Sequence, residues 1–465
     1  MKSSSEDISG GLSQSKRQIF ETKNIPSAVF YLAFPTVISQ IVMTVYNFAD
    51  TWFVGRTQNP KAVAALTVCA PFYAIMNGIS TLFGIGGSSA IARKLGKKDF
   101  DGAENVFKLS IAACLTLALL YSAVTLIFID KLLVISGTPQ TAYKSAHSYL
   151  LFTTVIGGIP AVLSGLFGQL VRSTGNSRAA AVGISLGALL NLGLDPLFIF
   201  VLFPKGFEVT AAAIATLLSN IVSCIFFIIL ITAKRDTVLS FSLKQFRFDK
   251  ETLYDVVMTG LPAASGIILA MVSNIFANSL ISSAGTDALA GLGVAKKSIT
   301  LAFNISMGIT QGVLPLAAYC YSSGNYSRMK KAALFSGASA LIFSAVCTLI
   351  FIFFGKNIIS FFIDSPQTIE YGDKYLRIMA LAVPMCALTY SVNTIFQAAG
   401  KKLCPFILSL LRKGPIDIPL MYIFKGMYGY SGVLYATPTA ELVSAATAIF
   451  MTFVFFKNMK KARRK

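Results

Sequence analysis

Long runs of apolar residues alternate with short polar segments along the whole chain. Each run has about 20 to 30 residues, enough for a helix to cross a hydrocarbon layer about 30 Å thick. Lipid offers no partner to a free backbone group, so each run is predicted to be an α-helix. We expect an all-α membrane protein with twelve transmembrane helices, at residues 30–54, 62–91, 103–129, 145–171, 179–203, 209–233, 253–283, 288–320, 332–355, 375–399, 403–424 and 431–456.

Composition and charge agree with a membrane protein. Of the 465 residues, 55% are hydrophobic and only 13% are charged, well below the charge of a typical soluble domain. The net charge of +20 is unevenly placed, because 29 of the 40 Lys and Arg fall on the side of the membrane that holds both termini. This bias predicts cytoplasmic termini in a bacterial-type cell membrane. The basic C-terminal tail, 457–465, is expected to meet lipid headgroups rather than nucleic acid.

The segments outside the apolar runs define the expected boundaries. Residues 1–29 contain no signal-peptide pattern, and Met1–Lys23 is predicted to be a disordered cytoplasmic tail. The polar, basic segment 234–250 is the expected cytoplasmic linker between a six-helix lobe at 30–233 and a second at 251–456. The seven cysteines lie in or beside apolar runs without metal-ligand spacing, so we interpret them as small hydrophobic residues.

The two lobes have similar sequences. Motifs recur in the same order, for example "AVAALTV" at Ala62 and "ALAGLGV" at Ala288, and "RSTGNS" at Arg172 and "QAAGKK" at Gln397. Asn47 and Asn274 stand at the same offset from a proline in each lobe. Because each lobe has an even number of helices, both copies enter the membrane in the same direction. Two pseudo-symmetric bundles with a cavity at their seam are therefore expected.

Two acids lie within the apolar runs of the first lobe. Asp50 is about 20 residues into the first predicted helix, and Asp195 is about 16 residues into the fifth, so both fall in the outer half of the membrane. Asn191 is one helical turn before Asp195, and Thr216 lies near the outer end of the sixth helix. In the second lobe Ala277 takes the place of Asp50. Acids in a membrane interior are costly and usually face a pathway, which predicts a site for a proton or Na⁺.

Several motifs resemble the multidrug and toxic compound extrusion (MATE) family of cation-coupled exporters. They are "YNFADTWFVG", "GIGGSSAIARKLGKKD", "NLGLDPLFIF", "AAAIATLLSN" and "QGVLPLAAYCYSSGNY", and the resemblance runs from about Ile25 to Lys457. It implies a cation site in the first lobe at Asp50, Asn191, Asp195 and Thr216. Some branches of the family also carry an acid after the proline of the seventh helix, but here that stretch reads "PAASGIILAMVSN". The expected coupling site is therefore in the first lobe alone.

Other polar residues in the apolar runs are candidates for the cavity or a gate. Arg412 and Asp417 lie in the eleventh run, where we expect them to pair near its cytoplasmic end, with snorkelling of Arg412 to the headgroups as the alternative. Glu441 is an acid inside the twelfth helix, with either a structural hydrogen bond or a substrate contact. Lys296 and Lys297 interrupt the eighth run, and their role stays open. The remaining candidates are Asn47, Asn274 and Gln311.

These features together predict a monomeric antiporter. It exports organic, cationic and amphipathic compounds by alternating access, in exchange for H⁺ or Na⁺, and it needs no cofactor. One alternative is a lipid-linked saccharide flippase of the related superfamily, but extra helices and an Arg-lined cavity are not evident in the sequence. An integral membrane enzyme is disfavoured by a single histidine and the lack of a metal cluster, and a channel by the one-sided acid pair.

Overall fold

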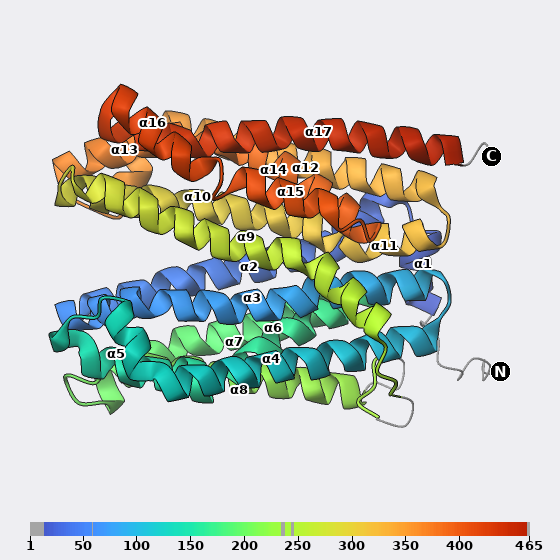
Figure 1. Ribbon diagram of the computed structural model, residues 1–465, viewed down its shortest axis with the longest axis horizontal. Helices are drawn as coiled ribbons and strands as arrows, with labels where there is room; N and C mark the ends of the chain where they lie inside the picture. Colours follow the sequence, from blue (N-terminus) through green and yellow to red (C-terminus); the bar gives the residue numbers. More distant parts are fainter. Residues whose placement is uncertain (1–13, 58, 234–237, 243–245, 463–465) are drawn as a thin grey trace, which may run out of the picture.

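The computed structural model describes residues 14–57, 59–233, 238–242 and 246–462. The first part of the predicted N-terminal tail and parts of the predicted linker and C-terminal tail lie outside these ranges. In Figure 1 two bundles of long helices lie side by side, one from the first half of the chain and one from the second. We call them the N-lobe and the C-lobe. Helix α1 and the C-terminal end of α17 lie at the same end of the molecule, called here the terminal end; α5 and α16 lie at the opposite, distal end.

The N-lobe includes three helices of more than 30 residues, and it is formed by six passes. They are α2 (Ile25–Arg56), α3 (Pro60–Gly96), α4 (Phe100–Ile135), a bent pass of η1 (Gln140–Ala142), α5 (Tyr143–Leu150), η2 (Leu151–Ile156) and α6 (Gly158–Ser173), then α7 (Ser177–Leu197) with η3 (Phe198–Leu202), and α8 (Glu208–Ala233).

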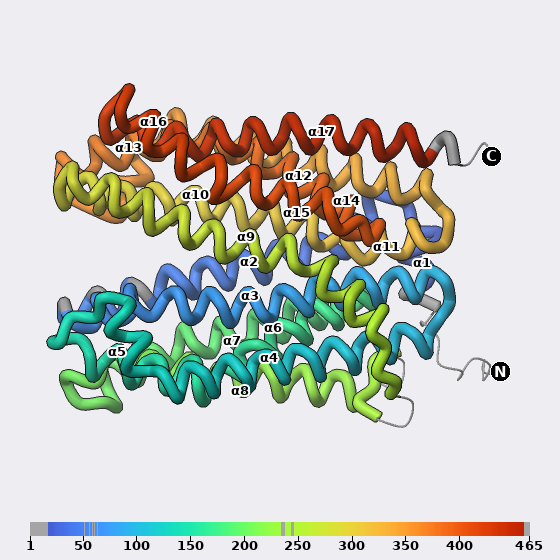
Figure 2. Tube along the Cα trace, in the orientation of Figure 1, coloured from blue at the N-terminus to red at the C-terminus, as the bar shows by residue number. Residues whose placement is uncertain are grey.

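Six further passes form the C-lobe. They are α9 (Lys250–Ser282), α10 (Thr286–Gly312) with α11 (Leu314–Ser322), α12 (Tyr326–Ser360), α13 (Pro366–Ala380) with α14 (Ala382–Ala398), α15 (Leu403–Arg412) with α16 (Asp417–Tyr428) and η5 (Gly429–Tyr435), and α17 (Ala436–Ala462). The tube in Figure 2 follows α15 and α16 from the terminal end to the distal end, and α17 back again. Gly414, with φ of +83°, and Pro415 interrupt this eleventh pass about halfway along.

The structure confirms the predicted all-α membrane fold. By length and apolar character, the described residues contain ten candidate membrane spans, or eleven when the bent pass of α5 and α6 is included. The last candidate, Leu403–Met459, holds both the broken eleventh pass and α17, which gives twelve passes. Large apolar side chains such as Ile127 and Phe353 are more than 70% exposed. Those side chains face outward, as expected where the surrounding solvent is lipid rather than water.

The repeat found in the sequence is also present in the backbone. Gly175 and Gly400 stand at equivalent places in "RSTGNS" and "QAAGKK", and both have a positive φ, +81° and +66°. Each follows the end of a helix at the terminal end, where a left-handed residue stops the helix, and glycine adopts that conformation without a Cβ clash. The two lobes therefore share local turn geometry as well as helix order.

Part of the predicted disordered tail is in fact a docked helix. α1 spans Gln14–Glu21, and the side chains of Ile19 and Phe20 are buried. Phe20 stacks on Tyr319, with ring centroids 4.9 Å apart, and Arg328 donates hydrogen bonds to three carbonyl oxygens at the end of α1. The prediction of disorder up to Lys23 is wrong, because the partners that order this segment come from the C-lobe, some 300 residues away in the sequence.

The lobes touch most closely at the terminal end. A Cβ placed on Gly260 of α9 would lie 1.7 Å from the carbonyl oxygen of Leu82 in α3, and one on Gly86 would lie 2.0 Å from the carbonyl oxygen of Val256. Two small residues at one crossing let the helix backbones approach each other. Just beyond this crossing, Arg93 of α3 forms an ion pair with Asp255 of α9 at 2.6 Å. Any opening of the terminal end must break these contacts.

We expect Gly260→Ala to disfavour this closed arrangement, because its methyl group overlaps a backbone carbonyl that cannot rotate away. Overpacking of this kind costs about 1–3 kcal/mol, so the ratio of open to closed molecules should rise about tenfold or more. Spin labels on the exposed residues Lys98 and Lys401, one in each lobe at the terminal end, measure the separation by electron–electron double resonance. Gly266→Ala is the matched control in α9, since its Cβ makes only an ordinary 3.8 Å contact with Ser409. Equal distance distributions for the two variants would contradict the expectation.

Candidate functional site

The two predicted N-lobe acids meet near the distal end. Asp50 lies in the last two turns of α2, and Asp195 lies in the last turn of α7. The Asp195 side chain is fully buried, Asp50 is partly buried, and their carboxyl groups are close enough to interact directly with each other. The helix ends position them: α2 and α7 both run from the terminal end to the distal end, so residues near their C-terminal ends reach the same depth. The prediction that both acids lie at one level is confirmed by this contact.

Asn191 and Thr216 complete a polar cluster around Asp195. The geometry fits an Asn191 amide whose nitrogen donates to Asp195 Oδ2 at 2.8 Å and whose oxygen accepts from the Thr216 backbone N–H at 3.0 Å. In the opposite amide orientation the nitrogen donates to the Thr216 hydroxyl at 3.3 Å. Asn191 and Thr216 are both buried. We call Asp50, Asn191, Asp195 and Thr216 the acid cluster.

Aromatic hydroxyls enclose the acid cluster. Tyr46, Tyr73 and Tyr149, from α2, α3 and α5, are close enough to both acids or to Asp50 alone to interact with them electrostatically. Directly after Asp195, Pro196 is followed by the π-helical segment η3. π-Helical turns inside helices are frequent at functional sites, where they displace side chains from the regular register. The acid cluster thus combines two acids with neutral polar groups, and tyrosine side chains from three helices lie around it.

A central cavity of about 540 Å³ lies between the lobes. Its lining comes from both halves of the chain, as expected from the repeat, and includes the predicted residues Asn47, Asn191, Thr216, Gln311 and Arg412. Gln311 donates to Gln397 Oε1 at 3.2 Å. The acids themselves lie behind this lining rather than in it, whereas Asn191 and Thr216 belong to both cavity and acid cluster. A ligand in the cavity is therefore separated from the acids by a single layer of side chains.

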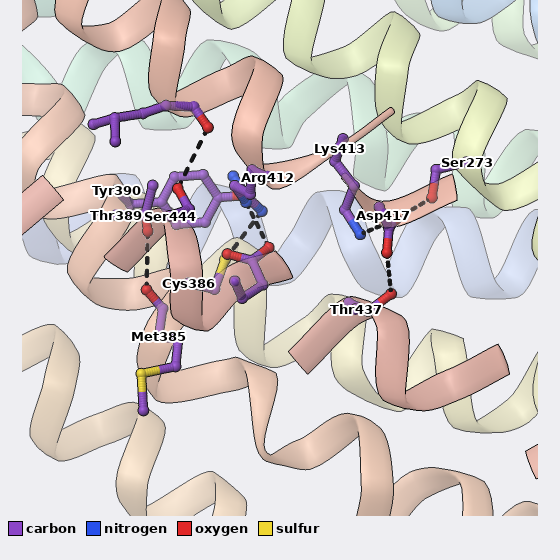
Figure 3. Close-up of polar contacts among 12 residues, drawn as sticks. Ser273, Met385, Cys386, Thr389, Tyr390, Arg412, Lys413, Asp417, Thr437 and Ser444 are labelled. Carbon is purple, nitrogen blue, oxygen red and sulfur yellow. Dashed lines mark hydrogen bonds and ion pairs between the residues drawn. The ribbon is translucent and has the colours of Figure 1, made fainter. Parts of the chain in front are cut away.

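The C-lobe holds two buried ion pairs at the break between α15 and α16. Arg412 binds Glu441 of α17, with 2.6 Å between Nε and Oε1, and also contacts Tyr390 and Cys386 of α14. Figure 3 shows the second pair, in which Lys413 Nζ lies 3.3 Å from Asp417. Asp417 also accepts hydrogen bonds from Ser273 and Thr437.

The predicted pairing of Arg412 with Asp417 is wrong. The backbone of Lys413 is extended rather than helical, so the neighbouring side chains of Arg412 and Lys413 point to different acids. Arg412 therefore pairs with Glu441, and Asp417 is left to Lys413. Arg412 is the last residue of α15, so it lies at the break in the eleventh pass rather than at the start of that pass. Of the two readings of Glu441, the structure shows the structural contact, an ion pair with Arg412.

Three further candidates lie away from the cavity lining. Asn274 is exposed on α9, so the pseudo-symmetry with Asn47 does not extend to its position. Lys296 donates to Asn278 Oδ1 at 2.8 Å, and Lys297 lies 5.6 Å from the ring centroid of Phe48. Both lysines are thus held by side chains of neighbouring helices. Arg172 also lines the cavity and was not among the residues predicted to do so, although the match of "RSTGNS" with "QAAGKK" aligns it with Gln397, another lining residue.

Comparisons with known proteins find similar sequences and structures over both halves of the chain. The sequence matches the MatE family over residues 35–197 and 262–423, once in each lobe. It is 27% identical over 438 residues to the multidrug export protein MepA of Staphylococcus haemolyticus, covering 93% of this chain and 94% of that protein. The fold is similar to a MATE crystal structure in complex with MaD3S, with a TM-score of 0.90, 25% identity and coverage of 97% and 100% of the two chains. It is equally similar to a multidrug resistance MATE family transporter in an outward-facing conformation, with a TM-score of 0.90, 25% identity and coverage of 97% and 99%.

We expect Arg412→Met to destabilise the protein strongly, because it leaves the fully buried Glu441 carboxylate without its cation. Losing one partner of a buried pair costs about 3–5 kcal/mol. Adding Glu441→Gln should restore much of the loss, since no buried charge then remains. Thermal unfolding of the purified protein in detergent measures both effects. Arg377→Met, which breaks the half-exposed pair with Asp373, is the control and should change stability by less than about 1 kcal/mol. A single variant as stable as that control would contradict the buried pairing.

Proposed function

Because the chain belongs to the MATE family of multidrug efflux transporters, we propose that it is a secondary active antiporter that exports organic compounds in exchange for H⁺ or Na⁺. The observation that carries this proposal is the contact between the Asp50 and Asp195 carboxyl groups. Two carboxylates about 4 Å apart repel each other by about 4 kcal/mol at an effective dielectric near 20. A proton shared between them, or a cation bound to both, removes the repulsion, so the acid cluster gains and loses one positive charge readily.

The hydrogen bonds around Asp195 favour a proton over Na⁺. The four side chains contain oxygen atoms, the ligand atoms that Na⁺ prefers, so their chemistry is compatible with a bound sodium ion. In the arrangement described above, however, Asn191 presents its NH₂ group to Asp195 and its oxygen to the Thr216 N–H. Na⁺ would need the amide turned around. A proton on one carboxyl needs no such change, since a protonated carboxyl donates to its ionised neighbour.

The contacts between the lobes support transport by alternating access. The Gly86 and Gly260 crossing holds the lobes together in the terminal half of the molecule, and α1 contacts the C-lobe at the terminal end. With cytoplasmic termini, as the charge bias favours, the cavity of this conformation belongs to an outward-facing state. Protonation of the acid cluster changes how α2 and α7 pack, and α2 also contacts the C-lobe through the hydrogen bond from Asn304 to Thr44. Cation binding in the N-lobe is thereby linked to the seam between lobes.

The cavity lining suits amphipathic organic substrates. Tyr46, Tyr73 and Tyr390 offer aromatic faces, Met43, Met76 and Met307 offer adaptable apolar surface, and several amides supply hydrogen bonds. The names of the relatives, multidrug export proteins, support substrates of this kind. Aromatic faces also accept the cationic compounds expected from the sequence. Since one chain supplies both lobes, a monomer in the lipid bilayer is sufficient for transport, without cofactor or nucleic acid.

The Asp50→Asn and Asp195→Asn variants should each abolish gradient-driven export while leaving the protein folded, because either one removes the charge that the coupling ion neutralises. The double variant should be little worse than either single one, since the two acids act on one ion. Dye efflux from membrane vesicles, under an imposed pH gradient and then an imposed Na⁺ gradient, measures the losses and identifies the ion. Asp130→Asn, an exposed acid beside Tyr143, is the control and should export at the parent rate. Losses that multiply would mean that the acids do not share an ion.

The topology prediction places the terminal end in the cytoplasm and the distal end outside. A cysteine at Lys205, an exposed residue of the distal loop, should react with an impermeant thiol reagent added to intact cells. One at Lys98, exposed at the terminal end, should react only after the cells are permeabilised. The native cysteines are buried or half-buried, so the parent protein supplies the background. The reverse pattern would overturn the orientation.

A further inference from the structure

All charged residues among the described lining of the central cavity are basic. They are Arg172 of α6, Arg412 of α15 and Lys413, and the rest of the lining is neutral. Two of these charges are balanced by acids directly behind the wall. Arg412 is paired with Glu441, and Lys413 is paired with Asp417. These two pairs leave little net charge for a ligand.

Arg172 is the exception. Its side chain is only 4% exposed, and its Nη1 donates to the neutral Gln169 Oε1 at 2.9 Å. Its Nε is buried without a hydrogen-bond partner, and within the described ranges Arg172 has no ion pair. A guanidinium withdrawn from water without an anion is costly, more so than the half-exposed arginines of the surface. Arg172 thus has a charge without an anion and a buried Nε without an acceptor, and its side chain forms part of the cavity lining.

We propose that Arg172 binds an anionic group of the transported compound, so that the substrates of this protein include amphipathic organic acids and zwitterions. The planar guanidinium matches a carboxylate with two parallel hydrogen bonds. The aromatic and methionine surfaces of the same cavity hold the apolar part of such a compound. A purely cationic compound would bind through the aromatic faces alone and would leave Arg172 without an anion. This inference rests on the proposed export function and specifies its substrate class.

The two lobes differ at this position as they do at the acid cluster. Gln397 of the C-lobe stands where the N-lobe has Arg172, and Ala277 stands where it has Asp50. Among the described residues of the cavity lining and the acid cluster, the charged groups that have no ion pair, namely the two acids of the acid cluster and Arg172, therefore all belong to the N-lobe. Arg172→Gln makes the two lobes alike at this position and keeps a side chain that can hydrogen-bond to Gln169. It is a conservative way to remove the charge.

Binding of a matched series of fluorescent probes to the purified full-length protein tests the proposal. Dansylglycine carries a carboxylate, its ethyl ester is neutral, and dansylcadaverine carries an amine, all on the same fluorophore. We expect the parent protein to bind dansylglycine about tenfold more tightly than the ester. Arg172→Gln should reduce this acid-to-ester ratio to about one, while Arg172→Lys should keep part of it. Arg178→Gln is the matched control, because Arg178 is exposed, stacks on Tyr31 and does not line the cavity.

Two results would overturn the inference: a parent protein that binds the ester as tightly as the acid, or an Arg172→Gln protein that keeps the parent ratio. The first result needs no variant, so it stands even if Arg172→Gln does not fold. Export of dansylcadaverine and dansylglycine from vesicles under pH and Na⁺ gradients separates this outcome from failure of the proposed function. Export of the amine without preference for the acid sinks only the substrate class, whereas export of neither compound under either gradient sinks the antiporter proposal.

Discussion

A charge in the interior of a membrane must find its counter-charge within the protein, and this constraint organises the polar half of the structure. Glu441 and Asp417 are fully buried, and each is held by a basic neighbour from the broken eleventh pass. Asp50 and Asp195 lie against each other, and neither has a basic partner among the ion pairs of the described residues. The C-lobe pairs are neutral as they stand, whereas under the proposed coupling the acid pair is neutralised by a proton or cation.

The same constraint connects the acid cluster with the cavity. Asn191 and Thr216 belong to both, so a change in the protonation of Asp195 reaches the lining through one side chain. In the same cavity lining, Arg172 carries a charge that no acid of the described lining neutralises. If a coupling ion neutralises the acids and a substrate anion neutralises Arg172, each ligand supplies a partner that the protein lacks. The coupling ion and the substrate anion would then each stabilise the conformation in which their own binding site is formed, through the charge that they neutralise.

Close backbone contact is the second feature that the mechanism needs. The crossing of α3 and α9 at Gly86 and Gly260 has no room for a side chain, and the ion pair of Arg93 and Asp255 lies beside it. Such contacts are either formed or broken, so the seam has discrete states rather than a range of openings. α1 adds a further contact at this end through Phe20 and Tyr319. The terminal end is thus the more firmly closed end in this conformation.

The sequence by itself determined the number of passes, the repeat and the depth of the N-lobe acids, because each depends on local composition and on distance along one helix. It placed Asp50 and Asp195 together since helix rise alone fixes their level. It did not determine which side chains meet between helices: Arg412 takes Glu441 rather than Asp417, and residues 14–21 fold against the distant Arg328. It also gave no sign that Arg172 is unpaired. Pairing depends on helix rotation and on breaks in the backbone, which only the packing of all twelve passes decides.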